Sequence, residues 1–568
     1  MNANARASVS TPDGKETSAR AGLALTPGTV MIGATILALG IRLFTLTRPG
    51  FLTQATEYDD GVYLGAAIRL TQGVLPYKDF AFVQPPGILL LMSPVALFSR
   101  VTSTVAGMVL ARVLTALAST ACIPLAGRLV RHRGTVTTAL TCGILAIYPS
   151  DIAAAHTLLL EPWMNLLCLV GANLAFSDGR LTARISRLAW AGVIIGVAGS
   201  VKYWAGAPAV VLLVICLLDG RGLGRRGLDG RRRRRPVLAY LGGLVAGFVI
   251  PVLPFLATGP GTFLRSTIVY QAARTGSYVS LSERLAHITG VIDLLDQAGR
   301  ITLSAGANSL FGQAVIADTV PASSTALPFV AFAAIVLVVA AGFWLSRHEL
   351  RQSEWFALVT AIGALVAILI YSAFFYHYPA FPGPWLAIVA GVALGQLIVR
   401  IPAVAVRQAL LGLAALVMVC VVVLQIADVA PLRTPPGAEE ISRMIPPGSC
   451  VVGDEVALLI MANRFEAAKP GCPVVIDALA TTLALTGGVS VQAGAEKDRS
   501  AVLAWRNIFL RAQYVWLSPN QWKRVPFGYG TADWKWFTDH FRQIVPNNPD
   551  ARPDVYIHGI GELYVPRT

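Results

Sequence analysis

The chain has 568 residues, of which 55% are hydrophobic and only 14% are charged, and its mean hydropathy is +0.62. This composition excludes a water-soluble globular protein, because repeated apolar runs of about 17–25 residues are typical of membrane helices. The net charge of +15 would suit a nucleic-acid-binding protein, but its arginines lie largely in short loops between apolar runs. The positive-inside rule explains that distribution, so no nucleic-acid partner is expected.

Eleven apolar runs are expected to cross the cytoplasmic membrane as helices. Eighteen arginines lie in five loops between them, and these loops mark the cytoplasmic face: 127–134, 177–187, 219–236, 346–351 and 400–407. The N-terminus then lies inside, with residues 1–27 as a disordered cytoplasmic tail, and the C-terminus lies outside. The expected spans are 28–47, 104–127, 135–150, 163–177, 188–201, 204–218, 237–257, 327–345, 354–373, 384–399 and 408–427, which together form a transmembrane domain over residues 28–427.

The apolar run 85–100 is interpreted differently from the eleven spans. It is short, opens with Pro85-Pro86 and contains Pro94. If it crossed the membrane, every later arginine-rich loop would lie on the opposite face. We therefore predict a juxtamembrane or re-entrant helix within a first outer loop that covers residues 48–103.

The C-terminal segment 428–568 has a different composition and is predicted to be an extracytoplasmic α/β domain. SCVVGDEVALLIMANR and GCPVVIDALATTLAL each resemble a short strand followed by a helix, and AQYVWLSP and DVYIHGIGELYV resemble further strands. Cys450 and Cys472 each begin a predicted strand. An oxidising location favours a disulfide between them, and the alternative is two buried thiols. The fold class is thus a polytopic α-helical membrane protein with a C-terminal α/β domain.

The stretch EYDDGVYLGAAIRLTQGVLPYKDF, residues 57–80, follows the first span and is unusually acidic for this chain. It contains Glu57, Asp59, Asp60 and Asp79. Carboxylates at a membrane interface are costly to desolvate unless water, a metal or a basic partner is present. In the ordinary alternative, Asp60 caps the following helix within a solvated loop. We favour a functional role for the Asp59–Asp60 pair.

Other polar residues are expected on the same outer face. The segment YPSDIAAAHTLLLEPW is predicted to place Asp151, His156 and Glu161 on one face, although Glu161 could simply cap a helix and His156 could simply pack. Lys202 is the one basic group in a short turn, where it either snorkels to the interface or holds a phosphate. The loop 258–326 adds Arg274 and Arg284. The segment YSAFFYHYPAFPGPW (371–385) crowds aromatic rings around His377, which suits either an interfacial aromatic belt or sugar stacking.

Carboxylates and cations at the outer membrane surface suit transfer of a sugar from a lipid phosphate. Lysine and arginine at headgroup depth can neutralise the departing phosphate, and a carboxylate can deprotonate the acceptor hydroxyl. No nucleotide is available outside the cell, so a polyprenyl-phosphate sugar is the natural donor. The sequence has no GxxxxGK[ST] loop, HExxH or CxxC motif, which argues against ATP-driven transport and zinc-protease chemistry.

The stretch YDDGVYLGAAIRL…PYKDFAFVQPPGILLLMSP resembles the first outer loop of GT-C glycosyltransferases, in the branch of protein O-mannosyltransferases and aminoarabinose transferases. HTLLLEPW, GSVKYW and YHYPAFPGPWLAIVAG resemble later motifs of that family, so the resemblance covers about residues 28–400. It implies that Asp59 is the general base and Asp60 the second acidic position. Many relatives carry a charged residue where Gln84 stands here. The C-terminal segment resembles actinobacterial envelope enzymes, which implies decaprenyl-phosphate mannose or arabinofuranose as donor.

The predicted enzyme is an inverting glycosyltransferase whose acceptor is an envelope glycan, glycolipid or protein. Asp59 is the predicted base, and Asp60 and Glu161 orient the acceptor or bind Mg²⁺ or Mn²⁺ if a cation is used. The donor phosphate is assigned to Lys202, Arg274 and Arg284. The sugar and acceptor pocket is assigned to Tyr63, Asp79, Gln84, His156, Tyr376, His377 and Tyr378. The alternatives are a lipid-linked sugar transporter, which would place charges at the bilayer midplane, and a non-catalytic scaffold.

Overall fold

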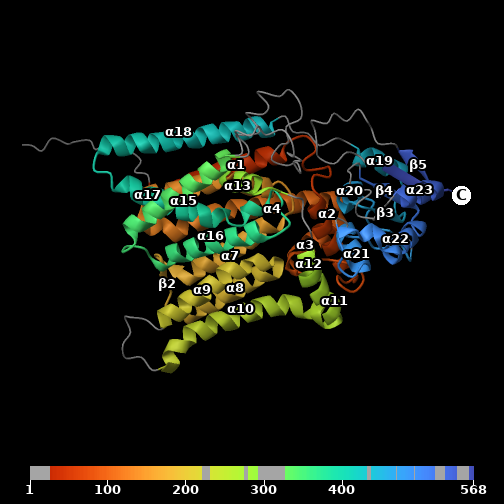
Figure 1. Cartoon of the computed structure of the whole chain (residues 1–568), viewed down its shortest axis with the longest axis horizontal. Helices are drawn as coiled ribbons and strands as arrows, with labels where there is room; N and C mark the ends of the chain where they lie inside the picture. The colour runs from red at the N-terminus through yellow and green to blue at the C-terminus, as the bar shows by residue number, and fades with distance from the viewer. Residues whose placement is uncertain are drawn as a thin grey trace, which may run out of the picture.

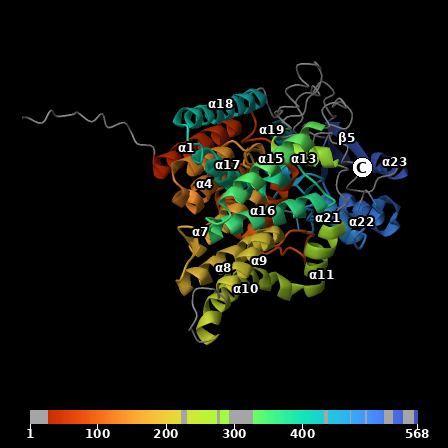
Figure 2. The same ribbon diagram turned by 60° about the vertical axis from the view of Figure 1, so that its left-hand side comes forward.

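The computed structural model describes residues 26–220, 230–273, 279–291, 326–430, 437–467, 470–490, 493–518, 531–545 and 562–567. Long helices run side by side through most of the molecule, and the C-terminal strands and short helices gather at one end of them beside α2 (Figure 1). In the turned view, α18 and α10 still lie on opposite flanks of this helical bundle (Figure 2). The mostly helical fold class predicted from the sequence is confirmed.

Each of the eleven predicted apolar runs contains a helix. These helices are α1 (Pro27–Leu46), α4 (Thr104–Val130), α5 (Thr135–Ala146), α7 (Leu160–Ala175), α8 (Ile185–Val201), α9 (Gly206–Gly220), α10 (Gly230–Thr258), α15 (Ala326–Ser346), α16 (Gln352–Ile370), α17 (Gly383–Val399) and α18 (Val404–Val429). Within the described residues, α1, α4, α10, α15, α16 and α18 are long and apolar enough to cross a membrane. The count of eleven spans and the orientation of the termini stay predictions.

Small residues let neighbouring helices of the bundle approach closely. A Cβ at Gly192 of α8 would lie 2.2 Å from the carbonyl oxygen of Tyr240, and one at Gly243 of α10 would lie 2.1 Å from that of Ala189. Only glycine fits at both positions, because a Cβ would clash with the backbone of the neighbouring helix. Such close backbone packing stabilises helix pairs in lipid, where no hydrophobic driving force acts between helices. The resulting α8–α10 pair forms one side of the bundle (Figure 1).

Short helices cover the end of the bundle that is predicted to face outward. They are α2 (Tyr58–Thr71), α3 (Gly87–Val101), α6 (Pro149–Ala154), α11 (Pro260–Leu264), α12 (Gln271–Ala273) and α13 (Leu281–Thr289). The run 85–100 is thus helical, with Pro94 inside α3. The expected span 135–150 is shorter than predicted, because α5 ends at Ala146 and Pro149 begins the separate helix α6.

The C-terminal residues form a four-stranded sheet with helices packed around it. The strands are β3 (Val451–Gly453), β4 (Tyr514–Leu517), β5 (Phe541–Val545) and β6 (Glu562–Pro566), and the helices are α19 (Ala438–Met444), α20 (Val456–Met461), α21 (Ala478–Leu485), α22 (Arg499–Leu510) and α23 (Thr531–His540). The strand order is β3-β4-β6-β5. The first pair is parallel, with Val452 opposite Val515, and the other two are antiparallel.

Two strand predictions for this segment are confirmed and one is wrong. SCVVGDEVALLIMANR forms β3 and then α20, and AQYVWLSP forms β4. GCPVVIDALATTLAL forms only the helix α21, which Asp477 caps by accepting from the amide of Ala480. Cys472, before this helix, is joined to Cys450 by the predicted disulfide. Most of DVYIHGIGELYV lies outside the described residues, and its end forms β6.

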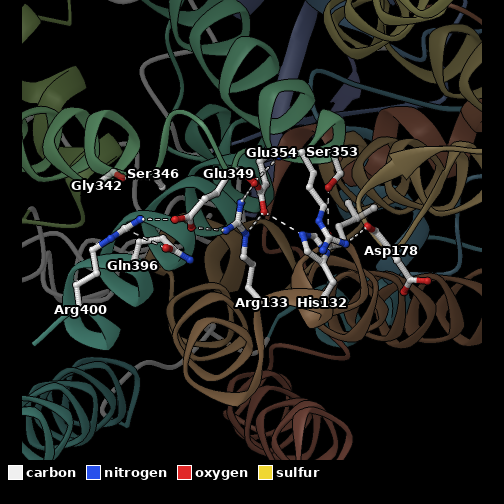
Figure 3. Close-up of polar contacts among 12 residues, drawn as sticks. His132, Arg133, Asp178, Gly342, Ser346, Glu349, Ser353, Glu354, Gln396 and Arg400 are labelled. Carbon is white, nitrogen blue, oxygen red and sulfur yellow. Dashed lines mark hydrogen bonds and ion pairs between the residues drawn. The ribbon is translucent and has the colours of Figure 1, made fainter. Parts of the chain in front are cut away.

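A buried ion cluster joins helices at the arginine-rich end of the bundle. Glu354, in the first turn of α16, accepts from Arg133 through Nε at 2.6 Å and Nη2 at 2.7 Å. His132 contacts the same carboxylate at 3.0 Å, and the backbone amide of Arg351 donates to it at 2.8 Å. Figure 3 shows these contacts continuing through Glu349 to Arg400. One fully buried carboxylate therefore holds the loop after α4 against the start of α16.

We expect Glu354→Gln to cost about 3–5 kcal/mol of unfolding free energy, because it leaves Arg133 without its buried counter-charge. The matched control is Glu349→Gln, whose carboxylate is 58% exposed and pairs with Arg133 and Arg400. That change should cost less than about 1 kcal/mol. Denaturation in detergent measures the unfolding free energy of both variants. A thiol-reactive dye follows unfolding by labelling the cysteines that are buried in the folded state, which are Cys122, Cys142, Cys168 and Cys216. Equal losses in the two variants would contradict the expectation.

Candidate active site

The first turn of α2 carries the acidic residues that the sequence singled out. Glu57 is the N-cap residue, and its Oε1 accepts from the amide of Tyr58 at 3.0 Å. Asp59 and Asp60 follow inside the helix, so the N-cap alternative considered for Asp60 is wrong. Carboxylates in the first turn of a helix are favoured by the positive end of the helix dipole. The turn therefore tolerates three acidic residues in a row of four.

The two adjacent aspartates have different environments. Asp60 is fully buried, and its Oδ2 accepts from Arg112 Nη2 at 2.7 Å and from the hydroxyl of Thr157. Burial raises the pKa of Asp60 above its usual range, while Arg112 and Thr157 oppose this effect. Asp59 is partly exposed, and its Oδ2 accepts from the hydroxyl of Tyr63 at 3.0 Å. Asp59 is thus partly accessible from outside the fold, whereas Asp60 ties α2 to α4 through Arg112.

Arg112 on α4 is a site residue that sequence reasoning missed. It is fully buried, and besides Asp60 its Nη1 donates to the carbonyl oxygens of Phe51, Leu52 and Gln54 at 2.6, 3.1 and 2.8 Å. One side chain therefore fixes both the loop that enters α2 and the first turn of that helix. An arginine inside a long apolar run is the sequence signal that could have revealed it, because such a charge needs a buried partner.

A second cluster forms around Glu161 at the start of α7. Its Oε1 accepts from Lys202 Nζ at 2.5 Å, and its Oε2 lies 3.1 Å from His377 Nδ1. The ammonium of Lys202 also lies over the rings of Trp204 and Tyr378, 3.8 and 4.5 Å from their centroids. Carboxylate and aromatic faces both stabilise a buried ammonium. Glu161 and Lys202, which the sequence analysis assigned to one site, are therefore in direct contact.

The segment Tyr376–Tyr378 connects the two clusters. The hydroxyl of Tyr376 donates to Glu57 Oε2 at 2.7 Å. The next residue, His377, contacts Glu161, and the ring of Tyr378 lies beneath the ammonium group of Lys202. Three consecutive side chains thus reach from the acidic turn of α2 to the cation beside α7.

His156, Asp151 and Glu161 do not lie on one helix, because α6 ends at Ala154 and α7 begins at Leu160. The chain turns between α6 and α7, so His156 packs near Phe51 and Tyr376, with ring centroids 6.1 and 6.5 Å away. Burial lowers the pKa of His156 to about 3, which leaves it neutral at physiological pH. Burial raises the pKa of Asp151 to about 8; Arg42 on α1 opposes this effect and Glu161 adds to it, so Asp151 lies near both side chains.

Several residues predicted to bind substrate have structural roles. Asp79 closes a turn by accepting from the amide of Leu75 at 2.7 Å. The side chain of Gln84 accepts from Gln271 at 3.1 Å. Arg284 donates to the carbonyl oxygens of Ile368, Leu369, Tyr371 and Ser372, so it caps the end of α16 and its assignment to a donor phosphate is corrected. Arg274 lies outside the described residues.

The two carboxylates proposed as metal ligands do not fit a shared cation. Asp60 is neutralised by Arg112, and Glu161 is neutralised by Lys202. In the part of the chain that the structure describes, no three His, Cys, Asp or Glu side chains form a group that could hold a metal ion. A Mg²⁺ or Mn²⁺ ion on these residues would have to displace both ion pairs.

Carboxylates of the C-terminal segment lie beside this site. The hydroxyl of Tyr58 donates to Asp477 Oδ1 at 2.9 Å. Glu455 is close enough to Asp60 to raise its pKa further. The neighbouring Asp454 accepts from the amide and the hydroxyl of Ser518 at 2.7 and 2.9 Å. Sequence reasoning did not place any of these residues near α2, because more than 380 positions separate the two segments.

We expect Asp454 to make stability depend on pH. Burial raises its pKa to about 7, whereas an unfolded aspartate titrates near about 3.9. Between these values the folded state binds the extra proton, so the free energy of unfolding falls as pH rises, by at most about 1.4 kcal/mol per unit. Comparing denaturation midpoints at pH 5 and pH 7 for wild type and Asp454→Asn isolates this effect. The same pH slope in both proteins would contradict it.

The fold is that of the GT-C glycosyltransferases. Two structures of ArnT from Cupriavidus metallidurans, one bound to undecaprenyl phosphate and one in the apo state, are each 14% identical to this chain, with a TM-score of 0.51; the alignment covers 94% of this chain and 97% of ArnT. The oligosaccharyltransferase AglB from Archaeoglobus fulgidus is 15% identical over 91% of this chain and 72% of its own, with a TM-score of 0.49. No protein-family model and no curated protein matches by sequence. At these low sequence identities, the structural likeness shows a shared fold and does not show a shared activity.

Proposed function

We propose that this chain is a membrane glycosyltransferase that moves a sugar from a polyprenyl-phosphate donor to an envelope acceptor. The observation that carries the proposal is the difference between neighbouring carboxylates on α2. Glu57 and Asp60 are buried and bonded to protein groups, whereas Asp59 is partly exposed and receives one phenolic hydrogen bond that can orient it. A partly exposed, oriented carboxylate is suited to accept a proton.

In the proposed reaction, Asp59 takes the proton of an acceptor hydroxyl as its oxygen attacks the anomeric carbon. The new carbon–oxygen bond forms on the face opposite the donor phosphate, which inverts the configuration. The bond from the anomeric carbon to the phosphate oxygen breaks, and the lipid phosphate leaves with that electron pair. Lys202 is the proposed counter-charge for the leaving phosphate, because of the two predicted phosphate ligands that the structure describes, Lys202 and Arg284, it is the one beside Glu161.

The second cluster supports the same reaction. Tyr376 and Tyr378 flank His377 between the proposed base and Lys202, where aromatic faces can pack on a sugar. Glu161 keeps Lys202 charged and oriented until a phosphate competes for it. The ArnT structure bound to undecaprenyl phosphate shows that this fold can hold a polyprenyl phosphate.

The test is radiolabelled sugar transfer in membranes that contain or lack the chain, with decaprenyl-phosphate mannose and decaprenyl-phosphate arabinofuranose offered separately. Label entering a glycan, lipid or protein from one donor, only when the chain is present, would support the proposal and name the sugar. If neither donor is used but labelled lipid-linked sugar crosses sealed vesicles, the chain is a transporter. Absence of both activities would favour the scaffold.

A further inference from the structure

Two glycines of α2 bring this helix into backbone contact with the C-terminal sheet region. A Cβ at Gly61 would lie 2.2 Å from the backbone nitrogen of Ala457 in α20. A Cβ at Gly65, one turn later, would lie 2.9 Å from Val456 Cγ1. A side chain at Gly61 would have to push the two helices apart, and one at Gly65 would have to displace the side chains of Val456 and Phe465. The sequence pattern Gly-x-x-x-Gly thus defines the face of α2 that receives α20.

Hydrogen bonds on both sides of this contact fix its position. At the start of α2, the hydroxyl of Tyr58 donates to Asp477 and accepts from the amide of Ala478, both at 2.9 Å. Near the end of α2, Arg69 donates to the carbonyl oxygen of Phe465 at 2.9 Å. A third anchor comes from α4, where the hydroxyl of Thr104 donates to the carbonyl oxygen of Ile460 at 2.6 Å. These contacts prevent α2 from sliding or turning against the C-terminal region.

We infer that α20 is a positioning element for the active site, and that Gly61 and Gly65 set the location of Asp59 by letting α20 seat on α2. This inference rests on the proposed role of Asp59 as general base. Asp59 lies two residues before Gly61 and next to Tyr58, so a shift of α2 away from α20 moves its carboxylate directly. A misplacement of about 1 Å in a catalytic group can cost on the order of 10²-fold in rate.

The contact at Gly65 allows a compensating pair of substitutions, because the obstructing atom belongs to a side chain. Gly65→Ala adds a methyl group 2.9 Å from Val456 Cγ1 and 3.3 Å from Phe465 Cζ. The second change Val456→Ala removes the nearer of these two atoms, and the ring of Phe465 must shift by only a few tenths of an ångström. Gly61→Ala has no such remedy, since the obstruction is backbone. The control is Gly242→Ala on α10, where an added Cβ has no heavy atom within 4 Å.

The experiment measures kcat and donor KM of full-length protein in nanodiscs, together with hydrogen–deuterium exchange of residues 57–63. Gly65→Ala should lower kcat roughly tenfold to a hundredfold with little change in KM and should speed exchange in the first turn of α2. The Gly65→Ala/Val456→Ala protein should recover both, and Gly242→Ala should match wild type. These results together would support a positioning role, because a purely structural contact would lower stability without changing kcat of the folded enzyme.

Two results would overturn the inference while leaving the proposed function intact. One is Gly65→Ala enzyme that keeps kcat within twofold of wild type. The other is a loss of kcat that the double variant does not restore. If wild type shows no transfer at all, the proposed function fails. The exchange data then decide only whether the packing of α20 fixes the position of the first turn of α2. Faster exchange at residues 57–63 that the double variant reverses would then support it, and unchanged exchange would overturn it.

Discussion

Asp59→Asn should lower the rate of sugar transfer by about 10²- to 10⁴-fold, the usual contribution of a general base. The amide cannot accept the acceptor proton at neutral pH, but its oxygen can still receive the hydrogen bond from Tyr63. Asp59 is partly exposed and forms no ion pair in the part of the chain that the structure describes. The variant should therefore unfold at the same denaturant concentration as wild type, with donor KM little changed.

The neighbouring Asp60 supplies the contrast for this experiment. Asp60→Asn removes the buried counter-charge of Arg112 and should lower stability as well as activity. We thus expect Asp59→Asn to lose sugar transfer but keep its stability, and Asp60→Asn to lose both. Full activity of the Asp59→Asn enzyme would remove Asp59 as the base and direct attention to Glu57.

Arg112→Met should lower the free energy of unfolding by about 3–5 kcal/mol. The change leaves Asp60 as a buried charge without its partner, and it strips the carbonyl oxygens of Phe51, Leu52 and Gln54 of their charged donor. Methionine has a similar length and is apolar, so it fills the space without replacing the hydrogen bonds. Chemical denaturation in detergent, with the buried-cysteine dye assay, measures the loss.

A double-mutant cycle separates the ion pair from the carbonyl contacts. If the Arg112–Asp60 pair dominates, the Arg112→Met/Asp60→Asn protein should be more stable than the sum of the two single losses predicts. Additive losses would show that the bonds to the loop carry the stability, and a loss below about 1 kcal/mol for Arg112→Met would contradict the role of Arg112.

Several features of this protein follow from the sequence because they depend on local pattern. The apolar runs predict helices, since their length and composition leave few alternatives in a membrane. The strand-to-helix pattern around Val451–Met461 and the strand at Tyr514–Leu517 depend on the same kind of short-range signal. The acidic stretch after the first span could be recognised because carboxylates are rare in this chain.

The roles of individual charges could not be predicted this way, because they depend on partners distant in sequence. Arg284 was expected in an outer loop whose composition suited a phosphate, yet it lies in α13 and caps α16 from 84 or more positions away. Arg112 looked like one more residue of an apolar run, and only its burial beside Asp60 shows what it does.

The sequence by itself determined that this is a multi-helix membrane protein with an acidic turn at the start of α2, since hydropathy and composition are properties of the chain. Only the tertiary structure decided which acidic residue is accessible. Asp59 and Asp60 are chemically identical neighbours, and Arg112 on α4 buries one of them while the other stays partly exposed. The same holds for α20, because backbone packing against Gly61 and Gly65 depends on how two distant segments meet in space.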